Sequence, residues 1–87
     1  MHEASLIRDL IQKVESLAKS EHAVRVTTVQ IWLGALSHMS AAHFREHFEQ
    51  AAKGTFADGA LLEIEESTDI RDPEAQQLLL RRIEVET

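Results

Sequence analysis

The stretch that decides the fold is VRVTTVQIWLGAL, residues 24–36. It is rich in β-branched and aromatic residues, and from Val29 to Ala35 apolar residues alternate with polar or small ones, as in a half-buried strand. The two valines before it alternate in the opposite phase. We therefore expect one inserted residue, a bulge or a bend, near Thr27 and Thr28.

Along the sequence, this strand is expected to lie between two amphipathic helices. Residues 4–20 carry apolar residues at spacings of three and four, which predicts the first helix; its core face would consist of Leu6, Ile7, Leu10, Ile11, Val14, Leu17 and Ala18. Ser37, or as the second choice Ser40, can cap a second helix that runs to about Lys53 and ends at Gly54. Its core face would consist of Ala41, Phe44, Phe48 and either Ala51 or Ala52.

Two further strands are expected in the second half of the chain. Residues 61–66 and 78–86 alternate apolar and mostly charged side chains. Between them, residues 67–77 include Asp72-Pro73, which favours a turn, so the simplest geometry is a long hairpin. The order is then α-β-α-β-β. It predicts an α/β (α+β) fold, with two helices packed on one face of a three-stranded sheet and the opposite face partly open.

The composition limits the possible functions of this 87-residue chain. It contains no cysteine, so disulfides, thiolate nucleophiles and cysteine-bound metals are excluded, and any metal must be held by nitrogen or oxygen. Its net charge of −6 disfavours nucleic acid and anionic membranes. The sequence shows no secretory signal, no apolar run long enough to span a bilayer and no catalytic motif. We expect a soluble, cytoplasmic protein that is not an enzyme, folded as one domain over residues 1–87.

The chain begins with Met1-His2-Glu3. The α-amine, the His2 amide and the His2 imidazole can close fused chelate rings around one metal. The Glu3 amide or carboxylate is near enough to complete a square plane of ligands. Such nitrogen-rich, square-planar surroundings suit Ni(II) or Cu(II). Amides bind a metal only when deprotonated, and the first N–H groups of a helix have no intrahelical acceptor. A histidine in second place is also a common accident at a frayed terminus.

Most of the chain resembles a known family. In this order it contains MHEASLIRDLIQKVESLA, VRVTTVQIWLGALS, AHFREHFEQAAKGT, ADGALLEIEE and RRIEVE. Block by block, these segments are similar to the HypA/HybF family of hydrogenase nickel-incorporation proteins. The resemblance implies that Met1, His2 and Glu3 bind nickel. It also implies delivery of the nickel to a [NiFe]-hydrogenase large subunit, or in some organisms to urease, together with a HypB-like GTPase.

The chain departs from the family pattern between its last two strands. Family members carry a zinc module with two CxxC pairs there, whereas this chain has only residues 67–77 and no cysteine. We therefore expect nickel but no structural zinc. Some relatives have an acidic residue at the position of Ser40, and this possible nickel ligand is missing here. The sequence therefore does not identify the fourth nickel ligand. A deletion of the zinc module, natural or engineered, would produce the same sequence.

Other histidines are candidates for additional nickel ligands. His43 and His47 are spaced i,i+4 on the second predicted helix, with the Glu46 carboxylate close by, and His38 precedes that helix. The alternative is that His43 and His47 flank the apolar stripe and face water, since a helical histidine pair without a third fixed ligand usually binds no metal tightly. We expect no metal role for His22, which follows the first helix.

The sequence also leaves open a function without metal. A paralogue could keep the docking surface of the family, on the first helix and the open sheet face, and act as an adaptor for hydrogenase maturation proteins. Trp32 alternates away from the predicted core, where it either covers the sheet or meets a partner. The open face and an unpaired edge strand make a homodimer possible.

Overall fold

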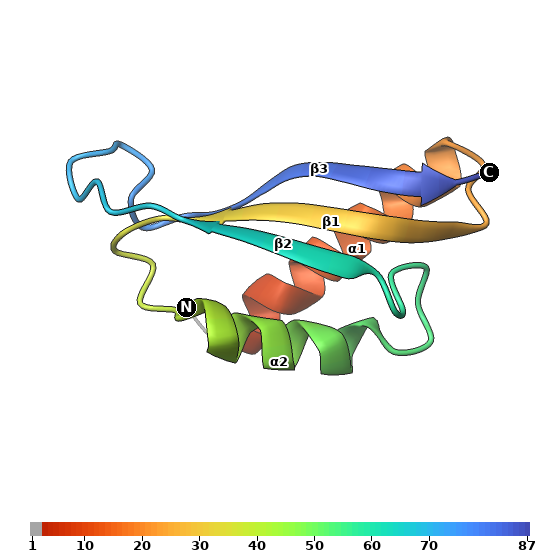
Figure 1. Cartoon of the computed structure of the whole chain (residues 1–87), viewed down its shortest axis with the longest axis horizontal. Coiled ribbons are helices and arrows are strands. Elements are labelled where there is room, and N and C mark those ends of the chain that lie inside the picture. The colour runs from red at the N-terminus through yellow and green to blue at the C-terminus, as the bar shows by residue number, and fades with distance from the viewer. Residues whose placement is uncertain (1–2) are drawn as a thin grey trace.

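The computed structural model describes the backbone of residues 3–87 and the side chains from Ala4 onward. The elements in chain order are α1 (Glu3–Ser20), β1 (Arg25–Leu33), α2 (Ala41–Ala52), β2 (Leu61–Glu66) and β3 (Leu78–Glu86). Figure 1 shows both helices on one side of the three-stranded sheet, as the sequence predicted. None of the helices described here is long and apolar enough to cross a membrane.

β1 is the central strand, and the sheet order is β2-β1-β3. It pairs parallel with β2 and antiparallel with β3. The expected hairpin between residues 61–66 and 78–86 is therefore wrong. The connection from β1 to β2 contains α2, which is the crossover that parallel neighbours require. Residues 67–77 then lead past the end of β1 to the other edge of the sheet, where β3 lies.

The expected irregularity in β1 is present. The register of β1 against β3 shifts between Val26 and Thr28, which confirms the bulge predicted near Thr27. The sequence did not predict a second shift, between Gln30 and Ile31 of β1. Their partners on β3 are Arg82 and Leu80, so Arg81 is the extra residue.

The core lies between the helices and the sheet. α1 contributes most of its predicted face, whereas Leu6 is half-buried and Leu17 is 39% exposed. From α2, the buried residues are Phe44, Phe48 and Ala52; Ala41 is half-buried and Ala51 is exposed. Val26, Val29, Ile31 and Leu33 of β1 complete the centre of the core. Ala35 lies beyond the end of β1 and is only half-buried.

The start of α2 is fixed by Ser40. Its hydroxyl oxygen accepts a hydrogen bond from the backbone N–H of His43 at 3.1 Å. The helix therefore starts at Ala41, with Ser40 and not Ser37 as the cap. Gly54, with φ of +79°, follows the last turn, as expected for a residue that ends a helix.

Residues 67–77 fold back against the end of β1. Gly34 donates a hydrogen bond from its N–H to the carbonyl oxygen of Gln77 at 2.9 Å, and Leu36 donates to that of Ala75 at 2.7 Å. Ser67 donates to the carbonyl oxygen of Leu33 at 2.9 Å. The connection is thus held by backbone hydrogen bonds at the end of β1 that precedes α2.

Candidate metal centre

The predicted nickel ligands are the first three residues of the sequence, and α1 begins at the third of them. Met1 and His2 are outside the described residues, and Glu3 is the first residue of the helix. The first N–H groups of an α-helix have no acceptor within the helix. The backbone amides that open α1 therefore lack intrahelical acceptors, which is the property that amide coordination of a metal requires.

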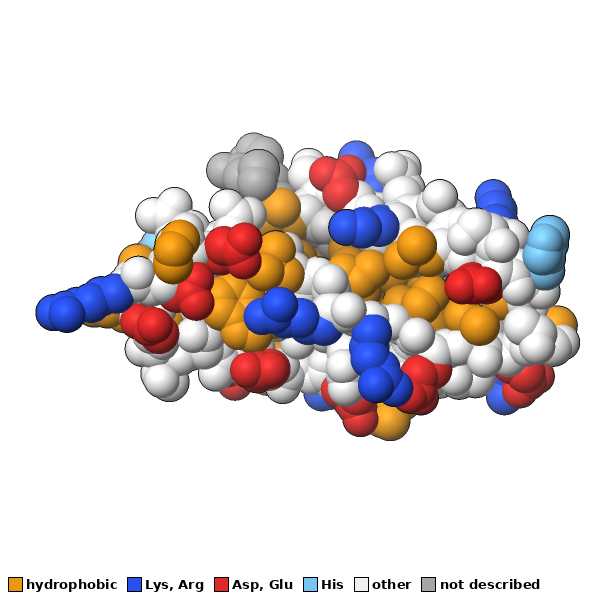
Figure 2. All heavy atoms as spheres, turned by 90° about the horizontal axis from the view of Figure 1, so that it is seen from above, with side chains coloured by type: hydrophobic (Ala, Val, Ile, Leu, Met, Phe, Trp, Pro, Cys, Tyr) orange, Lys and Arg blue, Asp and Glu red, His pale blue; other side chains and the backbone are white. Residues whose placement is uncertain are grey.

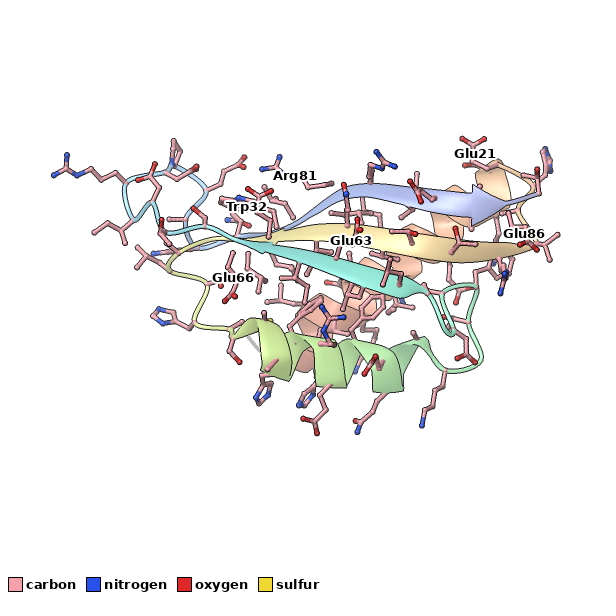
Figure 3. All side chains as sticks on the ribbon, in the orientation of Figure 1. Glu21, Trp32, Glu63, Glu66, Arg81 and Glu86 are labelled. Carbon is pink, nitrogen blue, oxygen red and sulfur yellow. The ribbon has the colours of Figure 1, made fainter. Side chains whose placement is uncertain are left out.

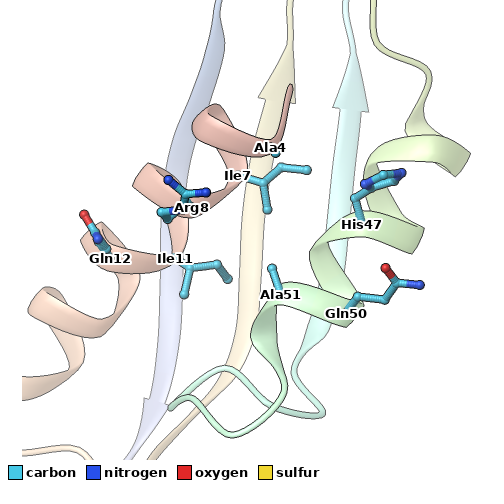
Figure 4. Close-up of a pocket in the computed structure, with 8 residues that line it drawn as sticks. All are labelled: Ala4, Ile7, Arg8, Ile11, Gln12, His47, Gln50 and Ala51. Carbon is cyan, nitrogen blue, oxygen red and sulfur yellow. The ribbon is translucent and has the colours of Figure 1, made fainter. Parts of the chain in front are cut away.

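A groove flanks the first turns of α1 on the side of α2 (Figure 4). Its apolar residues are Ala4, Ile7, Ile11 and Ala51, and its polar residues are Arg8, Gln12, His47 and Gln50. The fold thus places His47 and the first turn of α1 on the same groove. The sequence predicted neither this neighbourhood nor a role for Arg8, because helical periodicity assigns faces but not the distance between two helices.

A second hollow lies on another side of the same helix end. Leu6 lines it together with residues 36–39, which include His38, and residues 76–78 of the connection and β3. His38 is exposed and has φ of +60°, a left-handed conformation that non-glycine residues seldom adopt. The structure therefore places His38 and His47, which are nine positions apart, on two separate hollows that each include residues from the first turns of α1.

His43 and His47 do not point at a common metal position. Their rings are stacked, with centroids 4.5 Å apart and an interplanar angle of 7°. The lone pair of an imidazole nitrogen lies in the ring plane, so the lone pairs of two stacked rings lie in two nearly parallel planes and do not converge on one point between the rings. A metal shared by both side chains would require one ring to rotate out of the stack.

The residues described from Ala4 onward contain no cluster of three or more histidine, aspartate or glutamate side chains that could hold a metal ion. A complete site would thus need ligands from residues 1–3. Nickel binding by Met1, His2 and Glu3 stays a prediction, because Met1, His2 and the Glu3 side chain lie outside the part of the chain that the structure describes.

The connection 67–77 does not fit a zinc module. The chain has no thiolate to offer. Its polar side chains instead accept hydrogen bonds from nearby backbone N–H groups: Ser67 from Asp69, Asp69 from Arg71, and Asp72 from Glu74. This segment is a compact series of turns.

Comparison with known proteins identifies the family of the chain. Residues 1–71 match the model of the family described as "Hydrogenase/urease nickel incorporation, metallochaperone, hypA". The chain belongs to the HypA family. Among curated relatives, the hydrogenase maturation factor HypA of Chlorobium limicola is 38% identical over 66 residues, which is 76% of this chain and 57% of that protein. The HypA of Archaeoglobus fulgidus is 39% identical over 72 residues, which is 82% of this chain and 66% of that protein.

The chain thus spans little more than half the length of the first of these HypA relatives. The family match ends at residue 71, inside the connection, so it does not include β3. The likeness of fold extends further. The solution structure of the Ni metallochaperone HypA from Helicobacter pylori superposes with a TM-score of 0.82 over 99% of this chain and 98% of that one, at 20% identity.

Proposed function

We propose that this HypA-family chain binds one Ni(II) ion through Met1, His2 and Glu3 and delivers it during maturation of a [NiFe]-hydrogenase or of urease. The observation that carries the proposal is the family match, which includes these three residues. It is supported by the start of α1 at Glu3, where backbone amides lack intrahelical acceptors.

The chemistry of this terminus suits nickel. With Met1 as the first residue, the α-amine, the His2 amide and the His2 imidazole supply three nitrogens, and the Glu3 amide or carboxylate completes a square plane. His38 and His47 line the hollows beside the start of α1 and are the candidates for a replacement fourth ligand or an axial ligand. His43 lines neither hollow, and it would have to leave its stack with His47 before both could bind one ion.

The proposed role is transport without catalysis. An exposed terminal site lets the ligands of an acceptor replace those of the donor one at a time. The partners would be a HypB-like GTPase and the hydrogenase large subunit, or urease maturation proteins, in the cytoplasm. Residues 1–87 would form one nickel-binding domain that holds no zinc, with connection 67–77 in place of the zinc module.

Calorimetric titration of untagged protein with Ni(II) tests the site. We expect one ion per chain for the wild type. Binding should be lost in His2→Ala and in a variant with two glycines fused ahead of Met1, which moves the α-amine out of chelating range. Both variants should keep the circular dichroism spectrum of the wild type. Unchanged affinity in His2→Ala would exclude the site.

A metal-independent adaptor for maturation partners is the second candidate, favoured by the absence of the family's four cysteines. A pull-down with a HypB-like GTPase separates the two functions. Equal capture by protein incubated with Ni(II) and by chelator-treated protein, together with no nickel binding in the titration above, would favour the adaptor.

A further inference from the structure

The groove between α1 and α2 has an apolar floor that includes two alanines. Ile7 and Ile11 are buried in this floor, whereas Ala4 and Ala51 are exposed beside them. Ala4, Ile7 and Ile11 follow one another at spacings of three and four, so they form one stripe along α1. The groove has a volume of about 470 Å³. Because alanine side chains fill little of this space, larger apolar side chains of another molecule can enter it.

The rim of the groove is polar and carries positive charge. Figure 4 shows Arg8 and Gln12 on the α1 side and His47 and Gln50 on the α2 side. All four side chains are exposed. No carboxylate lines the groove among the residues from Ala4 onward, although the chain as a whole has a net charge of −6. The groove therefore differs in charge from the rest of the molecule.

The guanidinium of Arg8 is available to a ligand. Arg8 forms no hydrogen bond and no ion pair with another described residue. Asp9 adjoins it in the sequence but does not line the groove, because consecutive residues of a helix lie on different sides. Guanidinium groups bind carboxylates by paired, charge-assisted hydrogen bonds. The rim and the floor together therefore fit an apolar side chain that has a carboxylate next to it.

The β3 side of the molecule does not show this selectivity for one charge. There, hydrophobic side chains lie among charged side chains of both signs (Figure 2). Two cations on the sheet already have acidic partners on β3: Arg25 pairs with Glu86, and Arg82 pairs with Glu84. A partner with a single sign of charge is therefore selected by the groove and not by this side.

The shape of the groove favours a helical partner. Backbone N–H and C=O groups inside α1 and α2 bond within each helix, so the groove offers no edge to which a strand could pair. The stripe from Ala4 to Ile11 is about 10 Å long, at about 1.5 Å per residue. Apolar side chains at positions i, i+3 or i+4 and i+7 of a second helix span the same length.

We propose that this groove docks an acidic amphipathic helix of a partner protein. The apolar side chains of that helix would contact Ile7, Ile11 and Ala51, and its carboxylates would bind Arg8. The interaction does not require nickel. Because the groove flanks the first turns of α1, the partner would also lie beside the nickel-binding terminus, a consequence that rests on the proposed function.

NMR titration of isotope-labelled, metal-free protein with two synthetic peptides tests the chemistry. Each peptide is an alanine-based helix of about four turns with leucines at i, i+4 and i+7. The leucines are flanked by glutamates in one peptide and by lysines in the other. We expect saturable amide shifts at the groove with the glutamate peptide and about tenfold lower affinity for the lysine peptide, which corresponds to about 1.4 kcal/mol. No saturable shifts, shifts only outside the groove, or equal affinities would overturn the proposal.

Arg8→Glu tests the charge, with Lys13→Glu as its matched control. Both residues are exposed on α1 and both substitutions change the net charge equally, but Lys13 does not line the groove. Arg8→Glu should weaken binding of the glutamate peptide about tenfold and strengthen binding of the lysine peptide. Lys13→Glu should change either affinity by less than about twofold, since salt screens exposed charges. Equal effects of the two variants would reject the proposed site.

Ala51→Phe tests the shape of the groove. Ala51 is exposed, so a phenylalanine can fill the groove without entering the core, and it should abolish the shifts caused by the glutamate peptide. Retained binding by this variant, with an unchanged circular dichroism spectrum, would contradict the proposal. So would groove shifts that appear without peptide as the protein concentration rises, because a second copy would then occupy the groove. All samples are metal-free, so failure of the nickel site would leave these results unchanged.

Discussion

At the scale of single residues, Gly34 is the position where a side chain has the least room. A Cβ atom built on Gly34 would lie 2.1 Å from the carbonyl oxygen of Ala75, a backbone atom that cannot turn aside. The absence of a side chain therefore lets connection 67–77 approach β1 closely enough to form its hydrogen bonds.

Gly34→Ala is expected to lower the free energy of unfolding by about 3 kcal/mol, because overpacking against backbone forces the connection away from β1. Urea denaturation measures the change. Gly54→Ala is the matched control: the position has φ of +79° and no atom within 4 Å of the added Cβ, so only the conformational cost of about 1 kcal/mol should appear. Equal losses would show that the contact with Ala75 is unimportant.

Ser40 and Ser37 provide a second test at this scale. Because the Ser40 hydroxyl oxygen accepts the His43 N–H, Ser40→Ala should cost about 1 kcal/mol of stability. Ser37 lies before the cap, so Ser37→Ala should cost a few tenths of a kcal/mol at most. Thermal denaturation of both variants distinguishes them. The sequence favoured Ser37, since both serines precede the helical pattern and only the backbone geometry decides which one caps it.

At the scale of elements, the sequence predicted the type of all five segments, the bounds of β2 and β3, and the bulge near Thr27, whereas β1 ends at Leu33 and not at Leu36. It did not predict correctly which strands are neighbours in the sheet. Alternation in residues 61–66 shows which side chains face the core, but it is the same whether that strand pairs with β1 or with β3. The helix between β1 and β2 was the available signal for a parallel pair.

The proposed nickel site could be derived from the sequence only in part, for a related reason. Met1-His2-Glu3 can be recognised from chemistry and family resemblance. The positions of His38 and His47 beside the start of α1 depend on how the two helices and the β1–α2 connection pack. No local sequence pattern predicts that packing. The spacing of His43 and His47 suggested that they share one metal ion, whereas their rings are stacked, with the nitrogen lone pairs in nearly parallel planes.

Trp32 gives a test of the open sheet face. Trp32 is 5% exposed although both described helices lie on the other face of the sheet, and Figure 3 shows Arg81 beside it. Arg81→Ala removes the cation–π contact and should cost about 0.5–1 kcal/mol. Trp32 is the chain's one tryptophan, so its fluorescence emission should also shift to longer wavelength as water gains access. Arg71→Ala, at an exposed position of connection 67–77, should change neither quantity.

At the scale of the whole molecule, the fold is expected to be independent of metal. The core is formed by apolar side chains of both helices and all three strands, and the chain has no cysteine to hold zinc. A strong chelator should therefore leave the thermal unfolding midpoint unchanged within about 1 °C, unlike proteins whose folding depends on a structural metal. A large drop would reveal a structural metal ion.

The central claim is that the leading amine, the adjacent imidazole and neighbouring backbone amides hold Ni(II). Visible absorbance during titration of untagged protein tests it most directly. A yellow d–d band should rise to saturation at one Ni(II) per chain, as a square-planar nitrogen site produces, and it should strengthen with pH because the amides must lose protons. His2→Ala should show no band. A spectrum typical of octahedral nickel, or an unchanged band in His2→Ala, would contradict the account.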